Sequence, residues 1–160
     1  MTILNGTSGS ESLNGVAPDG TIYERIEAGS GDDFIRAAPT YQQVLPSQGN
    51  DTIVGGGRTT LLYWDSPSGV AVNFATGTAS DGWGTTDHFS GISDVHLTGH
   101  NDTVIGSNGN EYISYDPGGD LPDFFGPVIY GMMALHERGR ADEKEPIYRR
   151  TDRRRAARGR

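Results

Sequence analysis

The sequence predicts an all-β protein, a β-solenoid in which short repeats stack on one another around a shared interior. Three observations predict this class. Glycine makes up 24 of the 160 residues, about twice its usual share of roughly 7%, which indicates many tight turns. An aliphatic residue recurs every nine residues over much of the chain. The pattern G-x-D-x-I occurs at residues 31–35 and returns eighteen residues later, at 49–53.

The repeat unit is a nonapeptide, a run of turn residues followed by a short strand with an aliphatic residue at its centre. Cutting the chain every nine residues from Ala28 gives AGSGDDFIR, AAPTYQQVL, PSQGNDTIV and GGGRTTLLY. Strands this short are stable only when they stack on copies of themselves. The eighth position of each unit is therefore predicted to face the interior: Leu13, Ile22, Ile35, Val44, Ile53, Leu62, Val95, Val104 and Ile113.

Two nonapeptides and two turns close one flattened coil of eighteen residues, so residues eighteen apart lie above one another, about 4.8 Å apart. The repeats are predicted to form one domain over residues 1–121, with a register slip at residues 24–27. An insert at about 64–87 breaks the register again. There Val70, Val72 and Phe74 alternate with other residues and predict two alternating strands with these three on one face, within a longer hairpin or an irregular segment of the solenoid.

Residues 122–160 form an atypical basic tail. From Met132 onward there are ten basic residues and five acids, whereas the chain through Gly131 has three basic residues and sixteen acids. The arginine-rich end is interpreted as a disordered tail, as a non-native sequence such as a shifted reading frame, or as a segment that binds nucleic acid or another anionic surface. The first two are favoured and no nucleic-acid partner is expected, because the acidic body would repel phosphates.

Composition and motifs exclude several classes of function. There is no cysteine and hence no disulfide. The four histidines show no HExxH spacing, and no nucleophile–base pair or phosphate-binding loop is visible, so we expect no enzyme activity. The first residues lack the basic and apolar regions of a cleaved signal peptide. No apolar run reaches the roughly 18 residues that a membrane span needs.

Asp33 and Asp51 each follow a glycine turn and lie eighteen residues apart, so they are predicted to stack on one edge of the solenoid. Two charges at this spacing repel by about 1 kcal/mol in water and by about 3–4 kcal/mol at an effective dielectric constant near 20. A cation between them would remove this repulsion. Carboxylate and carbonyl oxygens suit Ca²⁺, which takes about 6–8 oxygen ligands, better than Mg²⁺. The sequence therefore predicts a calcium site.

The nonapeptides resemble the hemolysin-type calcium-binding repeat of bacterial RTX proteins, G-G-x-G-x-D-x-U-x. AGSGDDFIR matches this motif at all but the first glycine, and PSQGNDTIV keeps Gly49, Asp51 and Ile53. Residues 66–110 are also similar to an insert-plus-repeat segment of that family, and the resemblance covers roughly residues 6–120. It implies a parallel β-roll that holds Ca²⁺ between turns stacked on the same edge.

The resemblance also implies which residues hold calcium. On the opposite edge Gln42 and Thr60 stand at the acid position, so we expect few ions and not a full ladder. Glutamate replaces aspartate in two repeats and is expected to bind weakly. The implied ligands are Gly29, Gly31, Asp33, Gly49 and Asp51 for the main site, Asp102 and Asp120 for a second site, and Glu11 and Glu111.

The function that the resemblance implies is calcium binding by a repeat module of a secreted bacterial protein, exported by type I secretion machinery and folded outside the cell by Ca²⁺. Extracellular calcium modules typically bind at about 10⁻⁴–10⁻³ M, which fits such a switch. The basic tail does not resemble the family's C-terminal export signal. Two alternatives remain. In the first alternative, the chain is a remnant of a larger RTX hydrolase or protease. In the second, it is an adhesin-type spacer in which Trp64 and Trp83 contact glycans instead of capping the roll.

Overall fold

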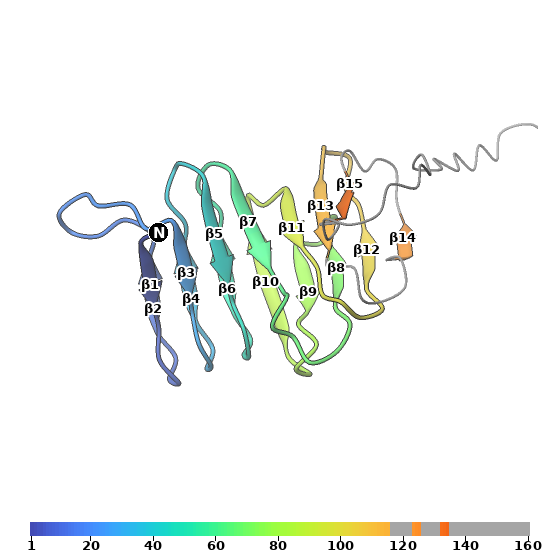
Figure 1. Cartoon of the computed structure of the whole chain (residues 1–160), viewed down its shortest axis with the longest axis horizontal. Coiled ribbons are helices and arrows are strands. Elements are labelled where there is room, and N and C mark those ends of the chain that lie inside the picture. The colour runs from blue at the N-terminus through green and yellow to red at the C-terminus, as the bar shows by residue number, and fades with distance from the viewer. Residues whose placement is uncertain (116–122, 126–131, 135–160) are drawn as a thin grey trace, which may run out of the picture.

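The structure is all-β, as predicted, in every residue that it describes. The computed structural model describes residues 1–115, 123–125 and 132–134, which contain fifteen strands and no helix. These strands form two sheets, sheet A with seven strands and sheet B with eight (Figure 1). In spatial order, sheet A contains β1 (Ile3–Asn5), β3 (Arg25–Glu27), β5 (Gln42–Leu45), β7 (Thr59–Leu62), β11 (Asp94–His96), β13 (Tyr112–Tyr115) and β15 (Met132–Ala134). Sheet B contains β14 (Asp123–Phe125), β12 (Thr103–Ile105), β8 (Ala71–Asn73), β9 (Thr78–Ser80), β10 (Thr86–Ser90), β6 (Thr52–Val54), β4 (Phe34–Arg36) and β2 (Ser12–Asn14).

Along most of the chain, consecutive strands belong to opposite sheets, so a strand pairs in parallel with the next strand but one. Phe34 on β4 lies opposite Thr52 on β6, an interval of eighteen residues. Arg25 on β3 lies opposite Gln43 on β5, again eighteen residues on. The interval arises because one passage through both sheets returns the chain to the same edge.

The core lies between the two sheets, and the central residues of most of the short strands within residues 1–115 belong to it. Strand alternation turns the central residue inward and its neighbours outward. Because many strands contribute one apolar side chain each, the core is long and thin. Seven of the nine predicted interior residues are confirmed as members of it: Leu13, Ile35, Val44, Ile53, Val95, Val104 and Ile113.

The prediction for Ile22 is wrong, since this side chain is 40% exposed. Residues 16–22 form a loop that is closed by an antiparallel bridge between Val16 and Ile22 and that projects from the N-terminal end of the molecule (Figure 1). The loop lengthens the first coil, so that Leu4 lies opposite Ile26, twenty-two residues on. Ile26 takes the interior place and is fully buried.

The prediction for Leu62 is wrong by one residue. Val44 on β5 lies opposite Leu61 on β7, so the interval between these paired residues is seventeen residues instead of eighteen. Leu61 therefore belongs to the core cluster. Strand alternation then places Leu62 on the outer face of sheet A, where neighbouring side chains cover it and leave it 1% exposed.

The insert adds two strands to sheet B and none to sheet A. Strands β8 and β9 form an antiparallel hairpin, which is one of the two predicted alternatives, and β9 also pairs antiparallel with β10. Strand β8 joins β12 and strand β10 joins β6, whereas in sheet A β7 pairs directly with β11. Val70 and Val72 are buried, and Phe74 packs against the core. Sheet B is therefore mixed, with three strands where a regular coil would have one.

Of the predicted tail, residues 122–160, the structure describes strands β14 and β15. They extend sheet B and sheet A respectively by parallel pairing with β12 and β13. The arginine-rich end lies outside the described residues, as does Asp120. The part of the chain that the structure describes includes no helix long and apolar enough to cross a membrane.

Candidate functional site

Four acidic residues form a column along the edge where strands of sheet B begin. The backbone N–H of Glu11 donates to Oδ1 of Asp33 at 2.8 Å, and that of Asp33 donates to Oδ1 of Asp51 at 2.8 Å. The N–H of Asp51 donates to Oδ1 of Asp87 at 3.1 Å. Each aspartate of this series therefore accepts a backbone hydrogen bond from the turn of the neighbouring repeat. We call Glu11, Asp33, Asp51 and Asp87 the acid column.

Glycine allows the turns of the column to stack this closely. Gly29, Gly31 and Gly49, which the sequence assigns to the site, all have positive φ angles. At Gly49 an added Cβ would lie 2.0 Å from the carbonyl oxygen of Gly31, which no other residue type would tolerate. The N–H of Gly31 donates to the carbonyl of Gln48 at 3.0 Å. The two turns that carry Asp33 and Asp51 are thus in backbone contact.

The second carboxylate oxygen distinguishes the aspartates of the column from one another. Asp33 is 3% exposed, and Asp51 and Asp87 are fully buried. Oδ2 of Asp33 and Oδ2 of Asp51 are buried without a hydrogen-bond partner. Oδ2 of Asp87 accepts a hydrogen bond from the hydroxyl of Tyr63 at 2.9 Å. Two acceptor oxygens in the stacked turns are therefore unsatisfied, which is costly for buried carboxylates.

Burial makes the charged form of these carboxylates unfavourable. Burial raises the pKa of Asp51 to about 7, and the neighbouring charge of Asp33 adds to the shift. Burial and the charge of Asp51 raise the pKa of Asp87 to about 8. Burial also raises the pKa of Asp33. At neutral pH the column therefore needs either protons or a cation.

The other predicted acidic ligands are held by their own turns. The backbone N–H and hydroxyl of Thr7 donate to the two carboxylate oxygens of Glu11 at 2.8 and 2.6 Å, and the hydroxyl bond is the main reason why the pKa of Glu11 is lowered. Thr98 in the same way donates to both oxygens of Asp102, at 3.1 Å from its N–H and 2.8 Å from its hydroxyl. Asp102 also accepts the N–H of Val70 at 2.9 Å, and burial raises its pKa.

Glu111 combines the two situations: one of its carboxylate oxygens is held by its own turn, and the other has no hydrogen-bond partner. Its Oε1 accepts hydrogen bonds from the N–H and the hydroxyl of Ser107, but its Oε2 is buried without a hydrogen-bond partner. The hydroxyl residue again lies four positions before the acid, as in the Thr7 and Thr98 turns. Gly29 takes that place before Asp33, so its turn cannot capture the carboxylate with a hydroxyl. Asp120, the proposed partner of Asp102, lies outside the described residues.

On the opposite edge of the sheets, an amide side chain stands at the position that the acid column fills with carboxylates. Gln42 is fully buried. Its Nε2 donates to the carbonyls of Tyr23 and Gly15 at 2.6 and 3.2 Å, and its Oε1 accepts the N–H of Ala38 at 2.8 Å. The Nε2 hydrogens of Gln42 therefore occupy the carbonyl oxygens of Tyr23 and Gly15, which a cation would otherwise coordinate. The prediction that Thr60 follows Gln42 at this position is wrong, because the seventeen-residue interval places Thr59 there.

Asp87 is the member of the column that the sequence analysis missed. The register break in the insert hid it, although Asp87 and Phe89 repeat the D-x-apolar signature of Asp51 and Ile53. Asp87 also lies thirty-six residues after Asp51, which is twice the coil length. Tyr63 was missed as well, since no repeat position requires a tyrosine.

Among residues 1–115 and the two described C-terminal strands, no three or more histidine or acidic side chains converge on one point to hold a metal ion. A cation in the column would therefore need backbone carbonyls as well as carboxylates. Comparisons with protein-family models, with curated proteins and with solved structures find no match to this chain.

Proposed function

We propose that the chain binds Ca²⁺ along the acid column, between the turns of Asp33 and Asp51 and between those of Asp51 and Asp87. The observation that carries the proposal is the pair of buried carboxylate oxygens without partners, Oδ2 of Asp33 and Oδ2 of Asp51. A divalent cation would satisfy both oxygens and neutralise the charges that burial opposes. Hard oxygen donors in an irregular arrangement favour Ca²⁺ over Mg²⁺ or Zn²⁺.

The architecture that accompanies this function is a parallel β-roll of the RTX type. The eighteen-residue intervals between β3 and β5 and between β4 and β6 support this interpretation, as do the turns whose glycines and acids match the nonapeptide motif. In this interpretation sheets A and B are the two walls of the roll, and the hairpin β8–β9 is an insertion into one wall.

Calcium would then control folding. The stacked turns that form the site exist only in the folded chain, so the free energy of binding adds to the free energy of folding. Without calcium the buried carboxylates oppose folding unless they are protonated. A chain of this kind would stay unfolded at low calcium and fold where calcium is abundant, which agrees with secretion through type I machinery and function outside the cell.

The test is a calcium titration of the full chain followed by far-UV circular dichroism, with chelator reversal. We expect a gain of β signal on adding calcium and its loss in chelator. Asp51→Asn removes a charge from both proposed sites and should move the midpoint to at least about tenfold higher calcium, since about 1.4 kcal/mol corresponds to a factor of ten.

Asp19→Asn is the matched control, because Asp19 is exposed in the loop of residues 16–22, and it should leave the midpoint unchanged. A full β signal in chelator that calcium does not alter would disprove the proposal. Equal midpoints for Asp51→Asn and the parent chain would disprove the assignment of the site.

A further inference from the structure

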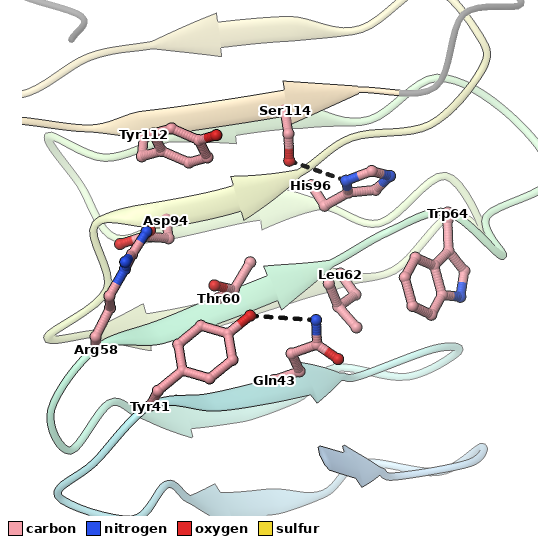
Figure 2. Close-up of a pocket in the computed structure, with 10 residues that line it drawn as sticks. All are labelled: Tyr41, Gln43, Arg58, Thr60, Leu62, Trp64, Asp94, His96, Tyr112 and Ser114. Carbon is pink, nitrogen blue, oxygen red and sulfur yellow. Dashed lines mark hydrogen bonds and ion pairs between the residues drawn. The ribbon is translucent and has the colours of Figure 1, made fainter. Parts of the chain in front are cut away.

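The outer face of sheet A carries a hollow over β5, β7, β11 and β13 (Figure 2). Its volume is about 520 Å³. Parallel register aligns the outward residues of these strands in rows, with Gln43 opposite Thr60, Thr60 opposite Asp94, and Asp94 opposite Tyr112. Asp94 is only 4% exposed although it is on the outer face. Neighbouring side chains of the lining therefore cover Asp94 at the base of the hollow.

Aromatic rings stand at both ends of the hollow (Figure 2). Tyr41 lies at one end and is 53% exposed, and Trp64 lies at the other and is 40% exposed. Tyr41 directly precedes β5, and Trp64 lies two residues beyond the end of β7. An exposed ring at each end of the hollow suits an elongated ligand better than a compact one.

The arginine in the hollow is fixed and neutralised by its surroundings. Arg58 donates from Nε and from an Nη nitrogen to Oδ1 of Asp94, both at 3.1 Å. Its guanidinium carbon also lies 5.8 Å from the ring centre of Tyr41 and 5.9 Å from that of Tyr112. The acidic residue and the arginine of the lining pair with each other, and Arg25, whose guanidinium carbon lies 5.4 Å from the ring centre of Trp64, pairs with Glu27. The hollow therefore favours a ligand without charge.

Hydrogen-bonding groups lie between the aromatic ends. The amide of Gln43 donates to the hydroxyl of Tyr41 at 3.3 Å (Figure 2). Thr60 and Ser114 add hydroxyl groups to the lining. Flat apolar ring faces beside neutral donors and acceptors match a molecule with apolar faces and many hydroxyls, which is the chemistry of a sugar chain.

We propose that this hollow binds a neutral oligosaccharide chain along the strand direction, with Tyr41 and Trp64 as stacking platforms and Gln43 as a hydrogen-bonding group. The site lies on the outer face of sheet A and shares no residue with the acid column. It goes beyond the proposed calcium function and does not depend on it.

The test measures binding of cellohexaose, maltohexaose and mannohexaose to the full chain by calorimetry and tryptophan fluorescence, with polygalacturonate as an acidic probe. Calcium is present throughout, and circular dichroism checks that each variant is folded. We expect at least one neutral hexasaccharide to bind. Trp64→Ala should weaken that binding by at least about tenfold, as aromatic anchors often do.

Trp83→Ala is the matched control, because Trp83 is 41% exposed but lies outside the hollow. It should leave the affinity unchanged, whereas Gln43→Ala should lower it without changing the β signal. The proposal is overturned if none of the three hexasaccharides binds, if only polygalacturonate binds, or if Trp83→Ala weakens binding as much as Trp64→Ala.

Discussion

At the scale of single residues, Asp51 carries the largest electrostatic conflict in the candidate site. Its Oδ1 accepts the backbone N–H of Asp33, which stabilises the charged form, while its Oδ2 is buried without a partner. The net result is a pKa of about 7, because burial outweighs the hydrogen bond. A residue in this state responds to both protons and cations, which makes its effect on stability measurable.

In calcium-free buffer we expect stability to fall as the pH rises from about 4 to about 8. The pKa values of Asp51 and Asp87 are about 7 and about 8 in the folded chain, against about 3.9 in an unfolded one. The folded state therefore binds more protons in this window, and the free energy of unfolding decreases with pH. For Asp51 alone the loss is on the order of 4 kcal/mol.

Far-UV circular dichroism in calcium-free buffer at a series of pH values follows this loss, and urea denaturation measures the free energy of unfolding at the lower pH values, where the carboxylates are protonated and the chain is folded. Asp51→Asn should flatten the pH profile, because asparagine cannot be ionised. A free energy of unfolding that rises between pH 4 and pH 8, or an Asp51→Asn profile as steep as that of the parent chain, would contradict the expectation.

Gly49→Ala tests the contact between stacked turns. The added Cβ would lie 2.0 Å from the carbonyl oxygen of Gly31, and Gly49 has a φ of 152°. Strain in such backbone conformations costs on the order of 1–3 kcal/mol, and the clash adds to it. We expect a loss of at least about 3 kcal/mol in the free energy of unfolding.

Gly84→Ala is the control for Gly49→Ala, since Gly84 has a φ of 100° but nothing lies within 4 Å of an added Cβ. It should cost only the strain of the backbone conformation, about 1–2 kcal/mol. Equal losses in the two variants, measured by denaturation in calcium, would show that stacking at Gly49 contributes nothing.

At the scale of elements, most interior positions were predictable, whereas the lengths of the repeats were predicted only in part, since the four-residue slip was recognised but placed at residues 24–27 instead of in the loop of residues 16–22. Ile35, Val44 and Ile53 recur every nine residues because each short strand contributes one inward side chain. The length of a turn or loop is free to vary, because extra residues can extend into solvent without disturbing the pairing of strands. The loop of residues 16–22 and the seventeen-residue interval that ends at Leu61 are two such variations, and neither carries a periodic signal.

Deleting residues 18–21 tests whether the pairing of strands β1 and β3 depends on the loop of residues 16–22. The deletion shortens the interval from Leu4 to Ile26 from twenty-two to eighteen residues, and all four deleted residues are exposed. We expect a folded protein with the same calcium midpoint and a free energy of unfolding within about 1 kcal/mol of the parent chain. Loss of the β signal at saturating calcium would show that the loop is needed for pairing.

The candidate site was predictable where the motif was regular. Asp33, Asp51 and their glycines were identified because motif and interval agreed. Asp87 was not, although it keeps the interval of thirty-six residues from Asp51, because it falls at the end of residues 64–87, which the sequence assigned to the insert; strand β10 pairs with β6 and places Asp87 beside Asp51. The capture of Asp102 by Thr98 depends on hydrogen-bond geometry within a turn, which a pattern of residue types does not reveal.

At the scale of the whole molecule, charge opposes compaction. Through Gly131 the chain has sixteen acidic residues and three basic ones. Self-repulsion of this size destabilises a compact state, and three buried aspartates in one column concentrate the effect. Cations that bind the column therefore act on the fold as a whole and not only on one turn.

The hairpin β8–β9 also makes the two sheets unequal in length. Between β6 and β12 sheet B has four strand spacings, whereas sheet A has two between β5 and β11. At about 4.8 Å each, one wall is longer than the other by roughly 10 Å over the same coils. Packing two sheets of unequal length face to face favours a bend of the long axis toward the shorter one, sheet A. Removing this hairpin would leave both sheets with the same number of strand spacings over this stretch.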